Sequence, residues 1–406
     1  MSQLSLIDSH GAVRPTHRSQ QNPQDRTAQP EFTSIEICAG AGGQAIGLRQ
    51  AGFGHLALVE LDQHAVQTLE HNIHTWQWEG EHCEVFEMDV KEFDPFRDMA
   101  RTSEALRRGE LDLLAGGVPC PPFSHAGKQL GRHDDRDLFP RMIELVETLL
   151  PRAVLIENVR GVMDPKFKKY RDWIIARLEG GVYFDDTEGQ FAEDDGLGYT
   201  VCRWDVLEAS DFGVPQLRPR AILVALRNDV LADSKYEWPT ATTEERCTVA
   251  RALEPSMRER FESSVPASVR RPAFDRWLAR AAIGGVAPTL VGGSKKHGGG
   301  DLGPSRAKAA WRKLGIDPMG IANDIATSVA NKTQERDLLR PDGPMLTVAQ
   351  ASIIQGFPPE WSFSGGKTAQ YRQVGNAFPP PVAKAVGRSI IDVLAADRER
   401  GRSISA

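Results

Sequence analysis

Short apolar segments recur at regular intervals over residues 34–229, and most of them end at a glycine or an acidic residue. Three segments have the apolar composition of buried strands: 34–38, 55–59 and 84–88. The chain between them places apolar residues at helical spacing, over 44–50 and 64–71. Alternation of strand and helix is typical of a parallel sheet with helices on its faces. The pattern therefore predicts an α/β domain that begins near residue 31.

A fourth strand is predicted over 111–115, and the chain that follows it is unusual. Gly116 and Gly117 turn the chain, and prolines then stand on both sides of Cys120. Proline fixes φ and excludes a helix, so the thiol sits on a stiff backbone at the end of a strand, where open α/β sheets bind ligands. Cys120 is a candidate nucleophile, and a small buried apolar residue is the alternative.

The next predicted strand, 153–156, runs directly into Glu157. A carboxylate at the end of a buried strand beside the cysteine-bearing strand suits acid–base chemistry. A helix cap or an exposed loop acid is the other interpretation. Between the two strands we predict a polar loop over 123–137 that closes over a bound substrate, then a helix over 138–150.

The glycine-rich segment Ala39-Gly40-Ala41-Gly42-Gly43 follows the first predicted strand. Glycines let backbone N–H groups and a helix N-terminus approach the polar part of a ligand. Glu60, 18 positions after Gly42, is placed to bind the two hydroxyls of a ribose, and Asp89 to accept from an adenine amine. Turn glycines with a purely structural role are the alternative.

The α/β rhythm continues to residue 229 and then stops. A helix is predicted over 173–178, an acidic surface loop over 185–198 and strands over 199–207 and 220–226. Arg218 and Arg220 stand on either side of Pro219, and arginine is suited to a planar, oxygen-bearing target.

From 231 to 340 the pattern predicts an irregular insert. Residues 264–313 carry ten basic side chains against two acidic ones, in a chain whose net charge is −6. The glycine-rich segment 291–300 lies within this stretch. Local positive charge with flexible backbone favours contact with nucleic-acid phosphates, and a solvated charged face is the alternative. Helices are predicted again over 348–354 and 382–394.

Composition bounds the remaining possibilities. No segment is apolar enough for a membrane span or a signal peptide, and residues 1–30 have the composition of a disordered tail. The five cysteines are scattered, so neither a metal site nor a disulfide framework is indicated, and a reducing cytoplasm is expected. No heptad pattern suggests an oligomer, so we expect a monomer.

Taken in order, these motifs resemble the DNA (cytosine-5)-methyltransferase family of bacterial or phage type. The resemblance covers roughly 34–229 and 340–388. It is carried by six motifs: Ala39-Gly40-Ala41-Gly42-Gly43, Pro119-Cys120, Glu157-Asn158-Val159, Gln216-Leu217-Arg218-Pro219-Arg220, Gln355-Gly356-Phe357-Pro358 and Gln373-Val374-Gly375-Asn376. It implies a doubly wound, mostly parallel Rossmann-like sheet with a smaller, irregular target-recognition domain. The expected division is a catalytic domain over 31–230, a recognition domain over 231–340 and a returning segment over 341–398.

The resemblance also implies roles for individual residues. Cys120 attacks carbon 6 of a flipped-out cytosine, Glu157 protonates or hydrogen-bonds N3, and Arg220 with Arg218 holds the O2 side. S-adenosylmethionine lies across the glycine loop, with Glu60 at the ribose, Asp89 at the adenine and Asn376 near the methionine end. The expected cofactor-binding residues are Ala39, Gly40, Gly42, Gly43, Glu60, Asp89 and Asn376, with double-stranded DNA as partner.

Three positions depart from the family pattern: Cys38 replaces phenylalanine, Pro121 follows the nucleophile, and Ala349-Gln350 replaces an Arg-Glu pair. None removes a reacting group. Two alternatives remain: a tRNA cytosine-5 methyltransferase with the same chemistry, and a catalytically silent regulator that binds DNA or S-adenosylmethionine. The long basic insert favours DNA, and the presence of both Cys120 and Glu157 favours an enzyme. The sequence leaves open the recognition sequence and any cognate restriction endonuclease.

Overall fold

The computed structural model describes residues 30–74, 76–78, 81–100, 106–119, 137–186, 188–242, 245–292 and 300–405. Three predicted features fall on other positions: the tail up to residue 29, Cys120 with nearly all of the 123–137 loop, and most of the glycine-rich segment 291–300. They lie outside the described residues and stay predictions.

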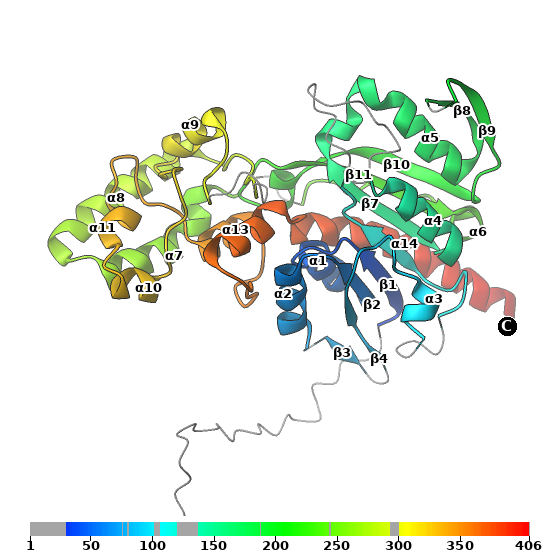
Figure 1. The fold of residues 1–406 in the computed structure, drawn as a ribbon, viewed down its shortest axis with the longest axis horizontal. Helices are drawn as coiled ribbons and strands as arrows, with labels where there is room; N and C mark the ends of the chain where they lie inside the picture. The colour runs from blue at the N-terminus through cyan, green and yellow to red at the C-terminus, as the bar shows by residue number, and fades with distance from the viewer. Residues whose placement is uncertain are drawn as a thin grey trace, which may run out of the picture.

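Seven strands of the described chain form one twisted sheet, in the order β10-β11-β7-β6-β1-β2-β5 (Figure 1). Their bounds are β1 (Phe32–Ile37), β2 (Phe53–Glu60), β5 (Glu84–Glu87), β6 (Leu113–Gly116), β7 (Ala153–Val159), β10 (Tyr199–Glu208) and β11 (Pro219–Arg227). Strands β5, β2, β1, β6 and β7 run parallel, whereas β11 and β10 pair antiparallel at one edge. The mostly parallel α/β fold expected from the sequence is confirmed.

Helices cover both faces of the sheet because its strands bury apolar side chains on each side. On one face, Ile143 and Val146 of α4 (Phe139–Leu149) share a core with Ile35 and Leu114. On the other, α14 (Pro380–Ser405) packs Val386 against the sheet. The remaining helices of this domain are α1 (Gly43–Ala51), α2 (Gln63–Ile73), α3 (Pro95–Asp98), α5 (Lys168–Glu179) and α6 (Asn228–Leu231).

Two differences from the predicted pattern concern this domain. The expected acidic loop over 185–198 contains strand β9 (Gln190–Asp194), which pairs with β8 (Gly181–Asp185) in a hairpin. The last helix runs well past residue 394, because Asp397 and Arg398 on its final turns form ion pairs with Arg152 and the buried Asp112. A second small pair joins β3 (Gln77–Trp78) to β4 (Glu81–His82).

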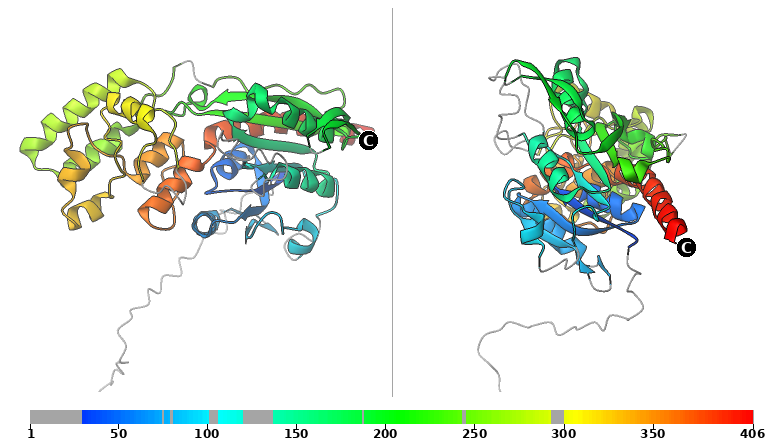
Figure 2. Two further views of the ribbon diagram at one scale, coloured as in Figure 1. Left: turned by 45° about the horizontal axis from the view of Figure 1, so that its top comes forward. Right: turned by 90° about the vertical axis from the view of Figure 1, so that its right-hand side faces the viewer.

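The second region lies at one end of the sheet and is helical rather than irregular (Figure 2). Its helices are α7 (Val249–Ser264), α8 (Ala267–Gly284), α9 (Ser305–Lys313), α10 (Ile325–Ala330) and α11 (Gln334–Leu338). Pro255 and Pro272 stand inside α7 and α8, and proline is a strong signal against a helix interior. Packing around the buried Trp277 and Trp311 overrides that signal.

The returning segment supplies α12 (Val348–Gln355) and α13 (Lys367–Asn376), of which only α12 was predicted. Ile354 of α12 and Tyr371 and Val374 of α13 belong to the same apolar core as Trp277. The second region therefore packs onto the chain that follows the predicted boundary at residue 340.

Candidate active site

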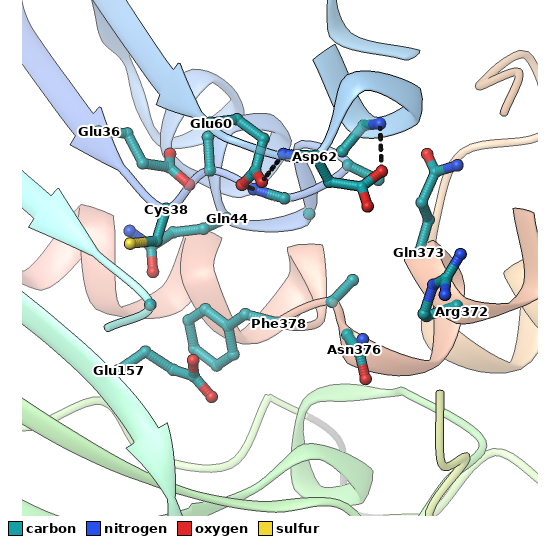
Figure 3. A pocket seen from close by; sticks show the side chains of 17 residues that line it. Glu36, Cys38, Gln44, Glu60, Asp62, Glu157, Arg372, Gln373, Asn376 and Phe378 are labelled. Carbon is teal, nitrogen blue, oxygen red and sulfur yellow. Dashed lines mark hydrogen bonds between the residues drawn. The ribbon is translucent and has the colours of Figure 1, made fainter. Parts of the chain in front are cut away.

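A cavity of about 440 Å³ opens at the carboxyl ends of β1 and β2, between the start of α1 and the end of α13 (Figure 3). This is the edge where open α/β sheets bind ligands. The described residues that line it are Glu36, Cys38, Ala39, Gly40, Ala41, Gly43, Gln44, Glu60, Asp62, Ala65, Gly117, Glu157, Arg372, Gln373, Asn376, Ala377 and Phe378.

The glycine loop forms one wall of the cavity. Gly40 and Gly42 have φ values of 54° and 86°, a left-handed conformation that favours glycine. Gly42 is not among the lining residues: a Cβ there would lie 2.8 Å from a ring carbon of Trp361, whose Nε1 donates to the Ala41 carbonyl at 3.0 Å. Gly42 thus allows the loop to pack closely against Trp361, on the side away from the cavity. At Gly43 a Cβ would overlap the Phe378 carbonyl, so only glycine permits α1 to approach that segment.

Glu60 closes the loop from the neighbouring strand. Its carboxylate accepts from the backbone N–H of Gly40 at 2.7 Å, of Leu61 at 2.9 Å and of Asp62 at 2.7 Å. These bonds fix its carboxylate at the wall of the cavity. Asp89, expected at the same ligand, does not belong to the lining residues; its Oδ1 accepts from the Lys91 N–H at 3.0 Å.

Glu157, on the opposite wall, forms an ion pair with Arg220. Nε of Arg220 lies 2.8 Å from Oε1 of Glu157, and each side chain is 12% exposed. The two residues sit on the paired strands β7 and β11. Burial raises the pKa of Glu157, although Arg220 and Arg218 oppose the shift. The result is a carboxyl group that holds a proton more readily than an exposed one.

A hydrogen bond holds the backbone that leads to Cys120 next to Glu157. Nδ2 of Asn158 donates to the Val118 carbonyl at 2.8 Å, and the Asn158 side chain is buried. A Cβ on Gly117 would lie 3.1 Å from Oε2 of Glu157, so the strand end passes directly over the carboxyl. Cys120 itself lies outside the described residues, but the chain reaches Pro119 two residues beyond this contact.

Arg218 has a different environment from Arg220. Its guanidinium is 1% exposed and donates to the carbonyls of Leu290 and Gly375, each at 2.8 Å. Burial and the neighbouring Arg220 lower its pKa. The sequence predicts both arginines at the substrate, whereas these contacts place Arg218 between the second region and α13. Asn376, next to Gly375, does line the cavity.

The sequence interpretation missed several lining residues. Glu36 is the last residue but one of β1, which the sequence predicts as a strand ending directly before the glycine loop. That signal was present in the sequence. Gln44 in the first turn of α1 and Phe378 after α13 carried no such signal, because only the approach of α1 to segment 377–378 brings them together.

Comparison with known proteins identifies the arrangement. Residues 32–392 match the family model described as C-5 cytosine-specific DNA methylase. The chain belongs to this family. As a C-5 cytosine DNA methylase it transfers a methyl group to carbon 5 of cytosine in DNA and uses S-adenosylmethionine as methyl donor.

Two curated relatives of the methylase cover most of its length. The Type II methyltransferase M.NaeI of Lentzea aerocolonigenes is 43% identical over 374 residues, which is 92% of this chain and 78% of the relative. The Type II methyltransferase M.NgoMIV of Neisseria gonorrhoeae is 42% identical over 371 residues, 90% of this chain and 98% of the relative.

Solved structures agree on the fold. The Entamoeba histolytica methyltransferase EhMeth is 14% identical with a TM-score of 0.54, over 90% of this methylase and 99% of that chain. The S. pombe Dnmt2 methyltransferase is 18% identical with a TM-score of 0.52, over 90% of this methylase and 98% of that chain. In the described part of the methylase no helix has the length and apolar character to cross a membrane.

Proposed function

We propose that this methylase modifies a cytosine within a specific double-stranded DNA sequence through a covalent adduct with Cys120. The observation that carries the proposal is the Glu157–Arg220 pair: Glu157 lines the glycine-loop cavity beside the backbone that leads to Cys120, and Arg220 contacts its carboxyl group. The proposal assigns a nucleophile, an acid and a cation to one edge of the sheet.

The residue types fit the chemistry of cytosine. Carbon 5 is a poor nucleophile until the Cys120 thiolate adds to carbon 6, which makes the ring enamine-like. Glu157 donates to N3 in its protonated form, which burial favours by raising its pKa, and so prevents negative charge on the ring. Arg220 stabilises the O2 side. After carbon 5 accepts the methyl group, loss of its proton to water breaks the sulfur–carbon 6 bond and frees Cys120.

The cavity fits the methyl donor, which supplies an electrophilic methyl group on a sulfonium. Of the described residues that line the cavity, four are acidic and one, Arg372, is basic. An acidic cavity favours a cationic ligand. We assign the adenosyl part to the wall made by Gly40 and Glu60, with Asn376 toward the methionine end. Gly42 and Asp89 act indirectly in this assignment, since neither lines the cavity.

Residues 231–340 are assigned to DNA recognition, because basic side chains gather between 264 and 313. The target base must leave the stack to reach Glu157. The relatives are named Type II methyltransferases, which supports duplex DNA as substrate and a cognate restriction endonuclease as functional partner. We assign the enzyme to the bacterial cytoplasm as a monomer.

Trapping on a modified substrate tests the proposal. Duplex DNA with 5-fluorocytosine at the target position blocks the elimination step, so the wild-type enzyme forms a cofactor-dependent covalent adduct, detected by denaturing electrophoresis and peptide mass spectrometry. The Cys120→Ser variant forms none, loses methylation and retains S-adenosylmethionine binding. An adduct on another residue, or residual turnover above a few per cent, contradicts the assignment.

A further inference from the structure

Gln44 carries a polar group that the described protein leaves unsatisfied. The side chain is 3% exposed, and neither Oε1 nor Nε2 has a hydrogen-bond partner among the described residues. A buried amide without partners carries a desolvation cost, and native proteins rarely keep such groups without a reason. Gln44 lines the cavity, so a ligand bound there is placed to supply the partners.

The position of Gln44 on α1 favours an anionic group nearby. The helix begins at Gly43, its N-cap Gly42 offers no side-chain cap, and no acidic residue stands in the first turn. The N–H groups of a helix N-terminus attract a carboxylate. The unpaired Nε2 of Gln44 adds a donor to this end of the helix.

Glu36, on the same wall of the cavity, favours a cationic group of the ligand. Glu36 is buried, its Oε2 has no partner among the described residues, and it lines the cavity with Cys38 and Gln44 (Figure 3). An amide offers one acceptor and two donors. A ligand with an ammonium beside a carboxylate therefore satisfies both ends of the Gln44 side chain at once.

We propose that Gln44 is a cofactor-binding residue that hydrogen-bonds the amino-acid end of S-adenosylmethionine. The inference rests on the proposed function, in which this cavity holds the methyl donor. Gln44 distinguishes ligands that carry the amino-acid end from those that lack it, and it does so at the expense of the stability of the ligand-free enzyme.

Calorimetric titration of the Gln44→Met variant tests the proposal, because methionine keeps the length and removes both polar atoms. The matched control is Gln50→Met, on the exposed side of the same helix. Three ligands are titrated: S-adenosylmethionine, S-adenosylhomocysteine and 5′-methylthioadenosine, which lacks the amino-acid end. The melting temperature of each ligand-free protein is also measured, and Gln44→Asn serves as a second, polar variant.

We expect Gln44→Met to lower the affinity for S-adenosylmethionine and S-adenosylhomocysteine by about tenfold or more. The affinity for 5′-methylthioadenosine falls by less than about twofold, because only the first two ligands lose hydrogen bonds to charged groups. The ligand-free variant melts at or above the wild-type temperature, and Gln50→Met changes no affinity. Equal weakening of all three ligands, unchanged affinities, or a lower melting temperature with unchanged affinities overturns the role of Gln44. Wild-type enzyme that binds none of the ligands overturns the proposed function as well.

Discussion

The carboxyl groups of the buried Glu36 and the largely buried Glu157 face the same cavity, and their surroundings give them different tasks. Glu157 has Arg220 at 2.8 Å, whereas Glu36 has no cation against it and an unpaired Oε2 among the described residues. Burial raises the pKa of both, and for Glu36 the charges of Glu60 and Glu157 raise it further. Each group therefore holds its proton to higher pH in the folded enzyme than in the unfolded chain.

Replacement of Glu157 by glutamine removes the proton that the proposed mechanism needs. We expect the single-turnover methylation rate to fall by about 10²–10⁴-fold, with S-adenosylmethionine affinity within about twofold of wild type. Because the protonated form is active, the wild-type rate falls as pH rises through the raised pKa of Glu157. Rapid-quench assays over a pH series measure both effects, with the exposed Glu144→Gln as control. The Cys120 thiolate becomes more populated as pH rises, so the two pH profiles are compared: a fall at high pH that persists in Glu157→Gln contradicts the role of Glu157 as acid.

The raised pKa of Glu36 affects stability rather than rate. Between its unfolded and folded pKa values the folded state binds more protons, so the free energy of unfolding of the ligand-free enzyme decreases as pH rises. We expect Glu36→Gln to flatten this dependence above the ordinary carboxyl range and to stabilise the protein at neutral pH. Urea unfolding at several pH values measures the free energy of unfolding of both proteins. Parallel curves for variant and wild type would show that Glu36 titrates normally.

At the scale of elements, helix packing sets the width of the cavity. Gly47 of α1 lies against α14 so closely that a Cβ would overlap the Pro380 carbonyl and lie 2.5 Å from the Ala383 Cβ. Gly387 makes the reciprocal contact: a Cβ at this position would lie 2.8 Å from the Cβ of Ala51. The two helices meet almost backbone to backbone, and this contact holds the first turn of α1 against segment 377–378.

Alanine at Gly47 should separate α1 from α14. We expect Gly47→Ala to lower the free energy of unfolding by about 1–3 kcal/mol, as overpacking does, and to weaken S-adenosylmethionine binding. Gly401→Ala is the control, because Gly401 is likewise a helical glycine, in α14, and a Cβ there meets nothing within 4 Å. Its expected effect is a gain of about 0.5–1 kcal/mol from helix propensity. Chemical denaturation compares the two, and equal effects would disprove the packing argument.

At the scale of the molecule, buried polar contacts join the helical region to the catalytic sheet. Nε2 of Gln216 donates to Oε1 of Gln355 at 2.8 Å, and Oε1 of Gln216 accepts from the Leu290 N–H at 2.8 Å. Arg218 adds bonds to Leu290 and Gly375. Leu290, which lies inside the basic stretch 264–313, is thus tied through Arg218 to the residue before Asn376, so the region proposed to bind DNA is connected to the proposed cofactor cavity.

Replacement of Arg218 should therefore lower the stability of the fold, whereas replacement of Arg220 should lower the methylation rate. We expect Arg218→Met to lower the free energy of unfolding by about 2–5 kcal/mol, since two buried carbonyls lose their donor. Arg220→Met leaves Glu157 able to take up a proton, so its cost appears mainly in the methylation rate. Denaturation curves and single-turnover rates separate the two. A normal stability for Arg218→Met, with lost activity, would place its guanidinium at the substrate instead.

The sequence by itself determined the sheet and the family. Strand periodicity and glycine or acidic strand ends are local signals, and they located the strands and Glu157 to within a few residues. Only tertiary structure decided what depends on contacts between distant segments. Packing around Trp277 and Trp311 keeps α7 and α8 helical despite their prolines, carbonyls from two segments hold Arg218, and the close approach of α1 to segment 377–378 brings Gly43 against Phe378. These outcomes are long-range because burial and hydrogen-bond satisfaction belong to the folded chain as a whole.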